Sequence, residues 1–239
     1  MRAPILILLT LLLAATASAD PAVQIRRIDE SALPAGATAL KAQDCFVGNL
    51  TTPVFMISDR IGGAERYRYS FWADPDLCNC TEGFTIDAVH MYMKFGTDDV
   101  PVSFDARGVF DQAEWNEASG AWVPGAEICS SPVTTIEISG AGMYDIFVEM
   151  AGGGCACAAW DYHYAVGFDL LTNFNSSPDM VVNGQPLGGQ SWVSSGGAWN
   201  DLLDGGLPGE ICIYADATCC ENPTSATPHT FGAVKSLYR

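Results

Sequence analysis

Alternation of apolar and polar residues, repeated in short runs, is the sequence feature that most restricts the fold. In residues 66–73 the aromatic side chains Tyr67, Tyr69 and Phe71 share one parity, and arginine or serine takes the other. Residues 100–110 alternate in the same way. This period of two is typical of a β-strand with one buried and one wet face. Sustained helical periods are absent from the sequence, and only residues 111–118 and 199–203 fit a helical turn.

Residues 84–95 also read as a strand, but their apolar phase changes partway. Phe84, Ile86 and Ala88 lie on one parity, whereas apolar residues from Val89 onward lie on the other. One extra residue inserted into a strand shifts the side-chain phase in this way. The sequence therefore predicts a β-bulge near Ala88.

Glycine-rich turns separate these runs, notably at residues 62–63, 96–99, 140–142, 152–154, 188–189, 196–197 and 205–206. Short alternating strands between such turns are typical of antiparallel all-β folds. We predict a β-sandwich or jelly roll of about eight to ten antiparallel strands, stapled by disulfides. A parallel α/β sheet would need helices between its strands.

The N-terminus has the composition of a cleavable export signal. A single arginine precedes an apolar run at residues 5–13, and Ala17-Ser18-Ala19 gives the small-x-small cleavage pattern. We predict a signal peptide at residues 1–19, an N-terminal arm at 20–40, and a single β-domain with a C-terminal tail at 41–239. No later apolar run is long enough for a membrane span, so the expected location is extracellular or at the cell surface.

Export makes disulfides the leading interpretation of the nine cysteines, which are Cys45, Cys78, Cys80, Cys129, Cys155, Cys157, Cys212, Cys219 and Cys220. An odd number leaves one outside any intramolecular set. Two Cys-x-Cys pairs and one adjacent pair are too close to bond internally without strain. We predict that the members of each pair cross-link to different distant segments. The alternative is a metal site formed by the two Cys-x-Cys pairs.

Acidity restricts the partners of the chain. A formal net charge of −17 repels nucleic acid phosphates and anionic lipid. It suits Ca²⁺, and the candidate loops are residues 74–76, 98–99 and 200–205, which offer carboxylate and carbonyl oxygens. We therefore predict no cofactor apart from a structural Ca²⁺ as an open alternative.

Catalytic signatures are missing from the sequence. The chain has three histidines, and neither a Gly-x-Ser-x-Gly elbow nor a His-Glu-x-x-His motif is present. Paired carboxylates remain as a hydrolytic option, with Glu137 and Glu149 on separate predicted strands. We predict no catalytic residue and favour a protein that is not an enzyme.

Aromatic residues are numerous for one domain and offer a binding surface. Trp115, Trp122 and Trp199 fall in stretches that resemble loops, and Tyr67 and Tyr69 share one strand face. Aromatic side chains combine a large apolar area with a polar handle. We take these five residues as candidates for contact with a glycan or a cell-surface protein.

The C-terminal residues 230–239, Thr-Phe-Gly-Ala-Val-Lys-Ser-Leu-Tyr-Arg, resemble the ending of a group of uncharacterised secreted bacterial proteins. These proteins are β-rich, carry close cysteine pairs and end in Trp-Gly-x-x-Lys-x-x-Tyr-Arg. Phe231 stands in place of the Trp. The Cys-Asn-Cys-Thr-Glu-Gly-Phe segment at residues 78–84 also resembles this group. The resemblance implies a secreted bacterial protein with a leaning away from catalysis.

Two functions follow from the sequence. The first is a secreted, non-catalytic binding or surface-structural module that recognises carbohydrate or a partner protein. The second is an extracellular polysaccharide hydrolase that uses carboxylates. A cleft holding two carboxylates roughly 5–10 Å apart would favour the hydrolase, and an aromatic surface without that pair would favour the binding module.

Overall fold

The structure is a computed structural model of the chain. It describes residues 23–28, 45–50, 55–57, 61, 64–78, 80–150, 155–172, 174 and 178–220. The predicted signal peptide and the tail at 230–239 lie outside the described residues. None of the described residues belongs to a helix that is both long enough and apolar enough to cross a bilayer.

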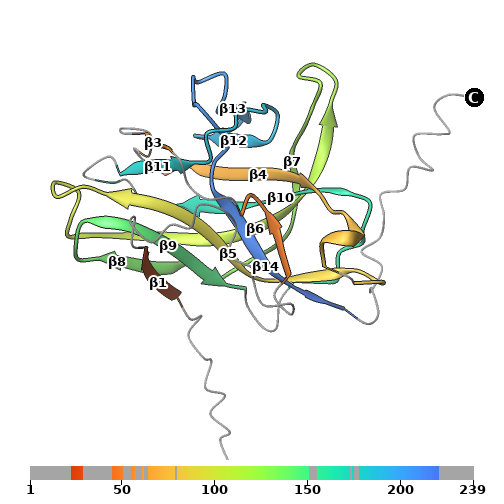
Figure 1. Cartoon of the computed structure of the whole chain (residues 1–239), viewed down its shortest axis with the longest axis horizontal. Helices are drawn as coiled ribbons and strands as arrows, with labels where there is room; N and C mark the ends of the chain where they lie inside the picture. The colour runs from red at the N-terminus through yellow and green to blue at the C-terminus, as the bar shows by residue number, and fades with distance from the viewer. Residues whose placement is uncertain are drawn as a thin grey trace, which may run out of the picture.

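Fourteen strands run through the described residues, and all paired strands are antiparallel (Figure 1). The all-β prediction is confirmed, with more strands than the eight to ten expected. Their bounds are Val23–Ile28 (β1), Cys45–Gly48 (β2), Phe55–Ile57 (β3), Arg66–Trp72 (β4), Phe84–Phe95 (β5), Val102–Asn116 (β6), Ala121–Ser130 (β7), Thr134–Ile138 (β8), Gly142–Glu149 (β9), His163–Leu170 (β10), Asp179–Val182 (β11), Ser191–Ser194 (β12), Asn200–Asp201 (β13) and Ile213–Cys219 (β14).

The strands form two seven-stranded sheets. The first, sheet A, has the order β1-β9-β5-β11-β3, and β14 joins β5 to β2. The second, sheet B, has the order β13-β12-β4-β10-β6-β7, and β8 pairs with β6. The N-terminal strand β1 pairs along its whole length with β9, which makes residues 23–28 an edge of sheet A.

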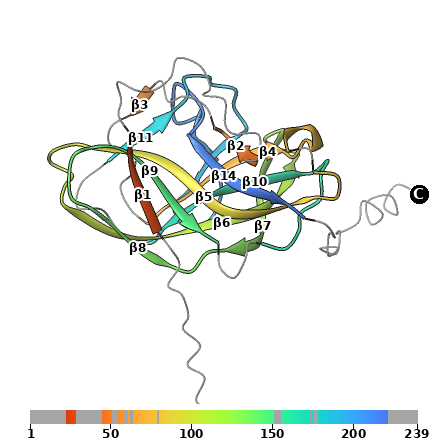
Figure 2. The same cartoon turned by 60° about the horizontal axis from the view of Figure 1, so that its bottom comes forward.

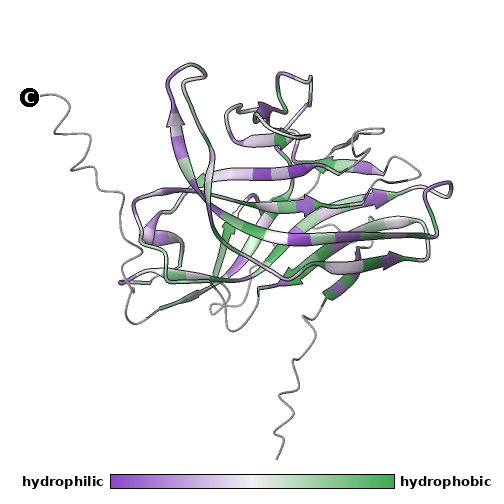
Figure 3. Ribbon diagram, turned by 180° about the vertical axis from the view of Figure 1, so that it is seen from behind, coloured by the Kyte–Doolittle hydropathy of each residue, from purple (hydrophilic) through white to green (hydrophobic). Residues whose placement is uncertain are grey.

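One hydrophobic core joins the two sheets into a β-sandwich (Figure 2). Large side chains from β5 and β9 of sheet A pack with those of β6 and β10 of sheet B. The sheets approach closely where Gly108 of β6 faces Val89 of β5, because a Cβ at Gly108 would lie 3.1 Å from that side chain. Hydrophobic and hydrophilic segments alternate along the strands (Figure 3), as the period of two predicts.

Strand β5 has the bounds and the bulge expected from the sequence. Its pairing with β14 places Asp216 opposite Ala88 and Ala217 opposite Ile86, so Asp87 is the extra residue. Side chains 88–91 are all buried, whereas burial alternates on both sides of them. The predicted bulge near Ala88 is confirmed, and it lets β5 present apolar residues to the core on both sides of the shift.

The two expected helical turns are wrong. Residues 111–116 continue strand β6, and residues 200–201 form strand β13. Pairing with β7 and β12 supplies their backbone hydrogen bonds, and this tertiary pairing overrides a weak local helical preference. A short 3-10 helix instead occurs at Pro75–Leu77, where the carboxylate of Asp74 accepts a hydrogen bond from the N–H of Asp76 at 2.9 Å.

Four disulfides confirm the interpretation of the cysteines. They are Cys45–Cys78, Cys80–Cys219, Cys129–Cys155 and Cys157–Cys220. Each close pair does send its two members to different segments, as predicted. The ninth cysteine, Cys212, is buried and belongs to none of these bonds. A metal site at the Cys-x-Cys pairs is therefore wrong, because a disulfide sulfur is not a thiolate ligand.

Candidate functional site

An aromatic groove of about 630 Å³ lies on the outer face of sheet B. The β6–β7 hairpin and the segment around β12 and β13 both rise from this side of the sandwich (Figure 1), and both contribute to its lining. Five of the chain's six tryptophans line it, namely Trp72, Trp115, Trp122, Trp192 and Trp199. We call this feature the tryptophan groove.

The floor of the tryptophan groove comes from three adjacent strands. On β4, Tyr67 and Phe71 belong to the core, so the alternate positions Ser70 and Trp72 face outward. His163 of β10 stands directly opposite Trp72. Trp192 of β12 is buried outside the core cluster, beside β4. The pleat of the sheet therefore places all four side chains on the outer surface.

The β6–β7 hairpin forms one wall. Trp115 and Trp122 occupy directly opposite positions near its tip, and their ring centroids are 5.6 Å apart. The turn is closed by the Asn116 side chain, which accepts hydrogen bonds from the N–H groups of Ala118 and Ser119. Gly120 completes it with φ of +65°, a backbone conformation that favours glycine.

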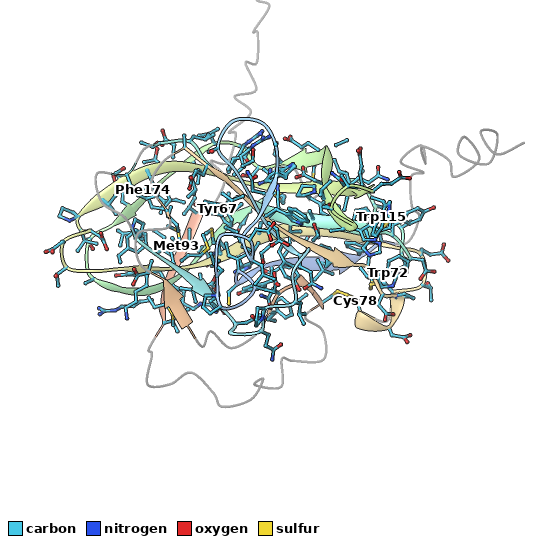
Figure 4. All side chains as sticks on the ribbon, turned by 90° about the horizontal axis from the view of Figure 1, so that it is seen from above. Tyr67, Trp72, Cys78, Met93, Trp115 and Phe174 are labelled. Atoms are coloured by element: carbon cyan, nitrogen blue, oxygen red, sulfur yellow. A yellow bond between two sulfur atoms is a disulfide. The ribbon has the colours of Figure 1, made fainter. Side chains whose placement is uncertain are left out.

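Register shifts bend this hairpin away from the plane of sheet B. The pairing of β6 with β7 slips on both sides of Asp111, and such bulges bend and twist a strand. Gly125 lies at the irregular stretch, where an added Cβ would meet the Gln112 carbonyl oxygen at 2.8 Å. The bend carries the two tryptophans over the sheet, and Trp72 and Trp115 lie at the same end of the molecule (Figure 4).

The opposite wall is a loop held by two carboxylates. Glu210 is buried and accepts hydrogen bonds from the N–H groups of Leu187 and Gly188, at 2.9 and 2.8 Å. Asp201 accepts one from the N–H of Gly189 at 2.6 Å and another from Leu203 at 2.9 Å. These backbone contacts fix the loop between β11 and β12 against the sheet. The groove wall is therefore preorganised.

Ring contacts connect the floor to the hairpin wall. His163 stacks on Trp122 with centroids 4.0 Å apart and an interplanar angle of 8°. Trp72 packs against the same imidazole at 4.8 Å and 60°. Burial lowers the pKa of His163, which favours a neutral ring at pH 7. The result is a continuous aromatic surface from Trp72 to Trp115, whose side chains are 45% and 53% exposed.

Arginines support the remaining tryptophan. The guanidinium of Arg66 lies 4.9 Å from the ring centroid of Trp199, and that of Arg68 lies 5.4 Å from it. Arg68 is buried and forms ion pairs with Asp111 at 2.6 Å and Asp169 at 2.8 Å. This network spans β4, β10 and β6 and anchors the sheet beside the groove.

The five aromatic residues taken from the sequence divide into two groups. Trp115, Trp122 and Trp199 all line the tryptophan groove, although the first two lie on strands and not in loops as expected. Tyr67 is buried in the core. The hydroxyl of Tyr69 donates a hydrogen bond to Gln190 Oε1 at 2.6 Å. Burial of Tyr69, together with the charge of Glu210, raises the pKa of this hydroxyl. Tyr69 therefore holds a groove residue from below.

Sequence reasoning overlooked three residues of the groove: Trp72, Trp192 and His163. A signal existed for Trp72, because it has the parity of Arg66 and Arg68, the wet face of the strand. In the structure Trp72 is 45% exposed, whereas Arg68 and Ser70 on the same face of β4 are buried. Trp192 and His163 gave no comparable signal, since their place beside Trp72 depends on strand pairing.

The acidic side chains in the candidate Ca²⁺ loops accept hydrogen bonds from nearby backbone N–H groups. Asp99 accepts a hydrogen bond from the N–H of Gly96 at 2.6 Å, and Asp74 and Asp201 accept the local bonds described above. Within the described ranges, no group of three or more His, Cys, Asp or Glu side chains is placed to hold a metal ion. A structural Ca²⁺ stays a prediction of the sequence.

The carboxylates of the hydrolase hypothesis lie away from the groove lining. Glu137 is on β8 of sheet B and exposed, and Glu149 is on β9 of sheet A. The acidic side chains that line the groove are Asp201 and Asp204. Both oxygens of Asp201 already accept backbone N–H groups, which suits a structural role.

Comparison with known proteins adds no assignment. No protein-family model, curated protein or solved structure matches the chain.

Proposed function

We propose that the chain is a secreted, non-catalytic module that binds carbohydrate in the tryptophan groove. The observation that carries this proposal is the gathering of five tryptophans on one face of sheet B. Exposed tryptophan is uncommon on a soluble protein, and a contiguous aromatic surface is typical of a binding site.

Sugar rings match this surface chemically. The negative face of an aromatic ring attracts the polarised C–H groups of a pyranose, and its flat area buries them. Polar groups stand beside the rings, including the side chains of Gln190 and Asn200. Apolar walls with a few convergent polar groups are the usual composition of a small-molecule site.

Secretion is supported by the N-terminal sequence and the four disulfides. Disulfides persist in oxidising compartments such as the extracellular space. The Cys80–Cys219 and Cys157–Cys220 bonds fasten the end of β14 to distant parts of the chain. Such covalent links suit a domain that works outside the cell.

A binding module is favoured over a hydrolase by the state of the acidic groups. Glycoside hydrolysis needs two carboxylates placed on either side of the scissile bond. In the groove Asp201 is committed to the backbone of its own wall. Asp204 is then a single carboxylate in the lining, where hydrolysis needs two, so the groove is better suited to stacking and hydrogen bonding than to cleavage.

A glycan array followed by titration calorimetry tests the proposal. The wild-type protein, produced with its disulfides formed, is screened for bound glycans, and the best glycan is titrated into Trp115→Ala and Trp72→Ala variants. Each substitution is expected to weaken binding by about 5- to 30-fold, because it removes a stacking surface worth about 1–2 kcal/mol. Val133→Ala is the control, since Val133 is exposed but does not line the groove.

Absence of any bound glycan would contradict the proposal. An affinity that is unchanged in both the Trp115→Ala and the Trp72→Ala variants would also contradict it. The bound glycans are also incubated with the protein and assayed for new reducing ends. Cleavage that disappears in Asp204→Asn would favour the hydrolase.

A further inference from the structure

Unsatisfied polar atoms gather in the floor of the tryptophan groove. Among the described residues, six buried side-chain nitrogen or oxygen atoms lack a hydrogen-bond partner. Three of the six belong to residues that line the groove: Ser70 Oγ, His163 Nδ1 and Trp192 Nε1. Buried polar groups are almost always hydrogen-bonded in proteins, so a cluster of exceptions needs an explanation.

Strand pairing makes these three residues neighbours. Trp192 of β12 stands opposite Arg68, two residues before Ser70 on β4. His163 of β10 stands opposite Trp72, two residues after Ser70. Ser70 is thus the diagonal neighbour of both, and its own partner on β10 is the small Ala165. Ser70 therefore lies between Trp192 and His163, and the three residues follow one diagonal across β12, β4 and β10.

Burial of this cluster makes an unmade hydrogen bond costly. The side chains of Ser70 and Trp192 are each 3% exposed. A buried donor or acceptor without a partner forfeits its hydration and gains nothing in return. All three atoms are buried below the groove surface, so a rotation of each side chain is needed to bring its polar atom to an entering ligand group. The hydrogen bond formed in this way recovers that loss, which makes these residues a favourable place for polar contacts.

Donor and acceptor chemistry defines the ligand groups that fit. An indole N–H only donates, so Trp192 needs an acceptor. A serine hydroxyl both donates and accepts, and a neutral imidazole nitrogen does one or the other according to its tautomer. Hydroxyl groups meet all of these needs, because each can accept from one neighbour and donate to the next. A quaternary ammonium has neither an acceptor nor a donor and would leave all three unsatisfied.

The charges around the groove disfavour an anionic ligand. No lysine or arginine is among the described residues that line it, whereas Asp201 and Asp204 are. The nearby guanidinium of Arg68 is committed to Asp111 and Asp169. A uronate or sulfate would be repelled by the two carboxylates of the lining. Arg66, which lies over the Trp199 ring and donates to Ser194 Oγ at 3.0 Å, is the cation whose attraction these carboxylates must outweigh.

We infer that Ser70, His163 and Trp192 form a polar subsite that recognises the hydroxyl groups of an uncharged oligosaccharide. This inference rests on the proposed carbohydrate binding and narrows it to neutral glycans. The aromatic wall supplies the stacking surface, and the polar subsite fixes which ring and which face of it bind.

Conservative variants of the folded protein test the subsite by calorimetry. Trp192→Phe removes the indole N–H and keeps an aromatic ring, and Ser70→Ala removes the hydroxyl. Each is expected to weaken binding of a neutral hexaose, such as cellohexaose or mannohexaose, by about 3- to 10-fold, the usual effect of one lost hydrogen bond. Trp160→Phe is the matched control, because Trp160 Nε1 is also buried without a partner but lies in the core. Ser103→Ala, on an exposed serine of β6, controls for the second variant.

Charge selectivity is tested with matched ligands. A hexamer of galacturonic acid is compared with its carboxyl-reduced form, which has the same linkages without the charge. The reduced form is expected to bind at least about tenfold more tightly at low salt, and tetramethylammonium chloride is expected not to compete.

The outcomes separate the two proposals. If the wild type binds none of these glycans, carbohydrate binding itself is refuted, and the subsite with it. If Trp115→Ala abolishes binding while Ser70→Ala and Trp192→Phe behave like their controls, the groove binds sugar but the subsite is refuted. If the acidic hexamer binds as tightly as its carboxyl-reduced form, or if tetramethylammonium competes with the glycan, the inference that the ligand is uncharged is refuted. Near-ultraviolet circular dichroism shows that each variant has kept its fold.

Discussion

Arg68 joins three strands of sheet B beside the tryptophan groove, and replacing it by methionine tests this support. Its Nε lies 2.6 Å from Asp111 Oδ2 and its Nη2 lies 2.8 Å from Asp169 Oδ1. Its Nη1 donates to the carbonyl oxygens of Tyr67 and Phe168, both at 3.0 Å. Methionine fills a similar volume and makes none of these bonds.

The expected cost is set by what the substitution leaves behind. Removing one partner of a buried ion pair typically costs about 3–5 kcal/mol, because a buried charge loses its compensation. Asp169 keeps a second partner, since Arg107 lies 2.8 Å from its Oδ2. The larger share of the loss therefore falls on Asp111. A decrease of about 3–4 kcal/mol in the free energy of unfolding is a large part of the roughly 5–15 kcal/mol of a typical domain.

The loss also depends on pH with a defined sign. Burial raises the pKa of Asp111, and the charge and hydrogen bond of Arg68 oppose that rise. Without Arg68 the pKa of the folded state rises further above that of the unfolded state. A carboxyl of this kind favours the folded state while it is protonated and loses that contribution as the pH rises through its folded pKa. The deficit of Arg68→Met is therefore smaller near pH 4 than at pH 7.

Urea unfolding, followed by tryptophan fluorescence at several pH values, measures both effects. The double variant Arg68→Met/Asp111→Asn is expected to regain about 1–2 kcal/mol at pH 7, because the unpaired charge is gone. A single variant that loses under about 1 kcal/mol would refute this reasoning. The reasoning would also be refuted if the double variant were as unstable at pH 7 as Arg68→Met alone.

Three further predictions concern the groove and the opposite sheet. Trp115→Ala should change the free energy of urea unfolding by under about 1 kcal/mol while weakening glycan binding, because the side chain is half exposed. Glu210→Gln should lower stability by about 2 kcal/mol and speed amide hydrogen exchange in the loop it holds, since the buried carboxylate accepts several hydrogen bonds. Burial lowers the pKa of His90, but its hydrogen bond to Asp145 and the charges of Asp145 and Asp216 outweigh this and raise it. Stability from His90 should therefore be full below about pH 6.5 and decline as the pH rises through the folded pKa, and His90→Gln should flatten that decline in urea unfolding.

The sequence alone predicted several of the strands and the use of the cysteines, because these depend on neighbouring residues. Residues 84–95 carry their own alternation and phase change, so the strand and its bulge could be read locally. The close spacing of Cys78 and Cys80 showed that they bond elsewhere, whereas their partners, Cys45 and Cys219, are set by the fold. The extended conformation of residues 111–116 could not be predicted from the sequence, because it depends on their pairing with β7.

The tryptophan groove was decided by tertiary structure. Trp115 and Trp122 carried a readable aromatic signal, but their place opposite one another depends on the register of the hairpin. Trp72, Trp192 and His163 meet because β4 pairs with both β10 and β12. Side-chain parity along one strand reveals which residues share a face, but strand order and hairpin bending determine which faces meet. The sequence therefore predicted that aromatic residues gather on a surface, and only the folded sheet determined which of them line the groove.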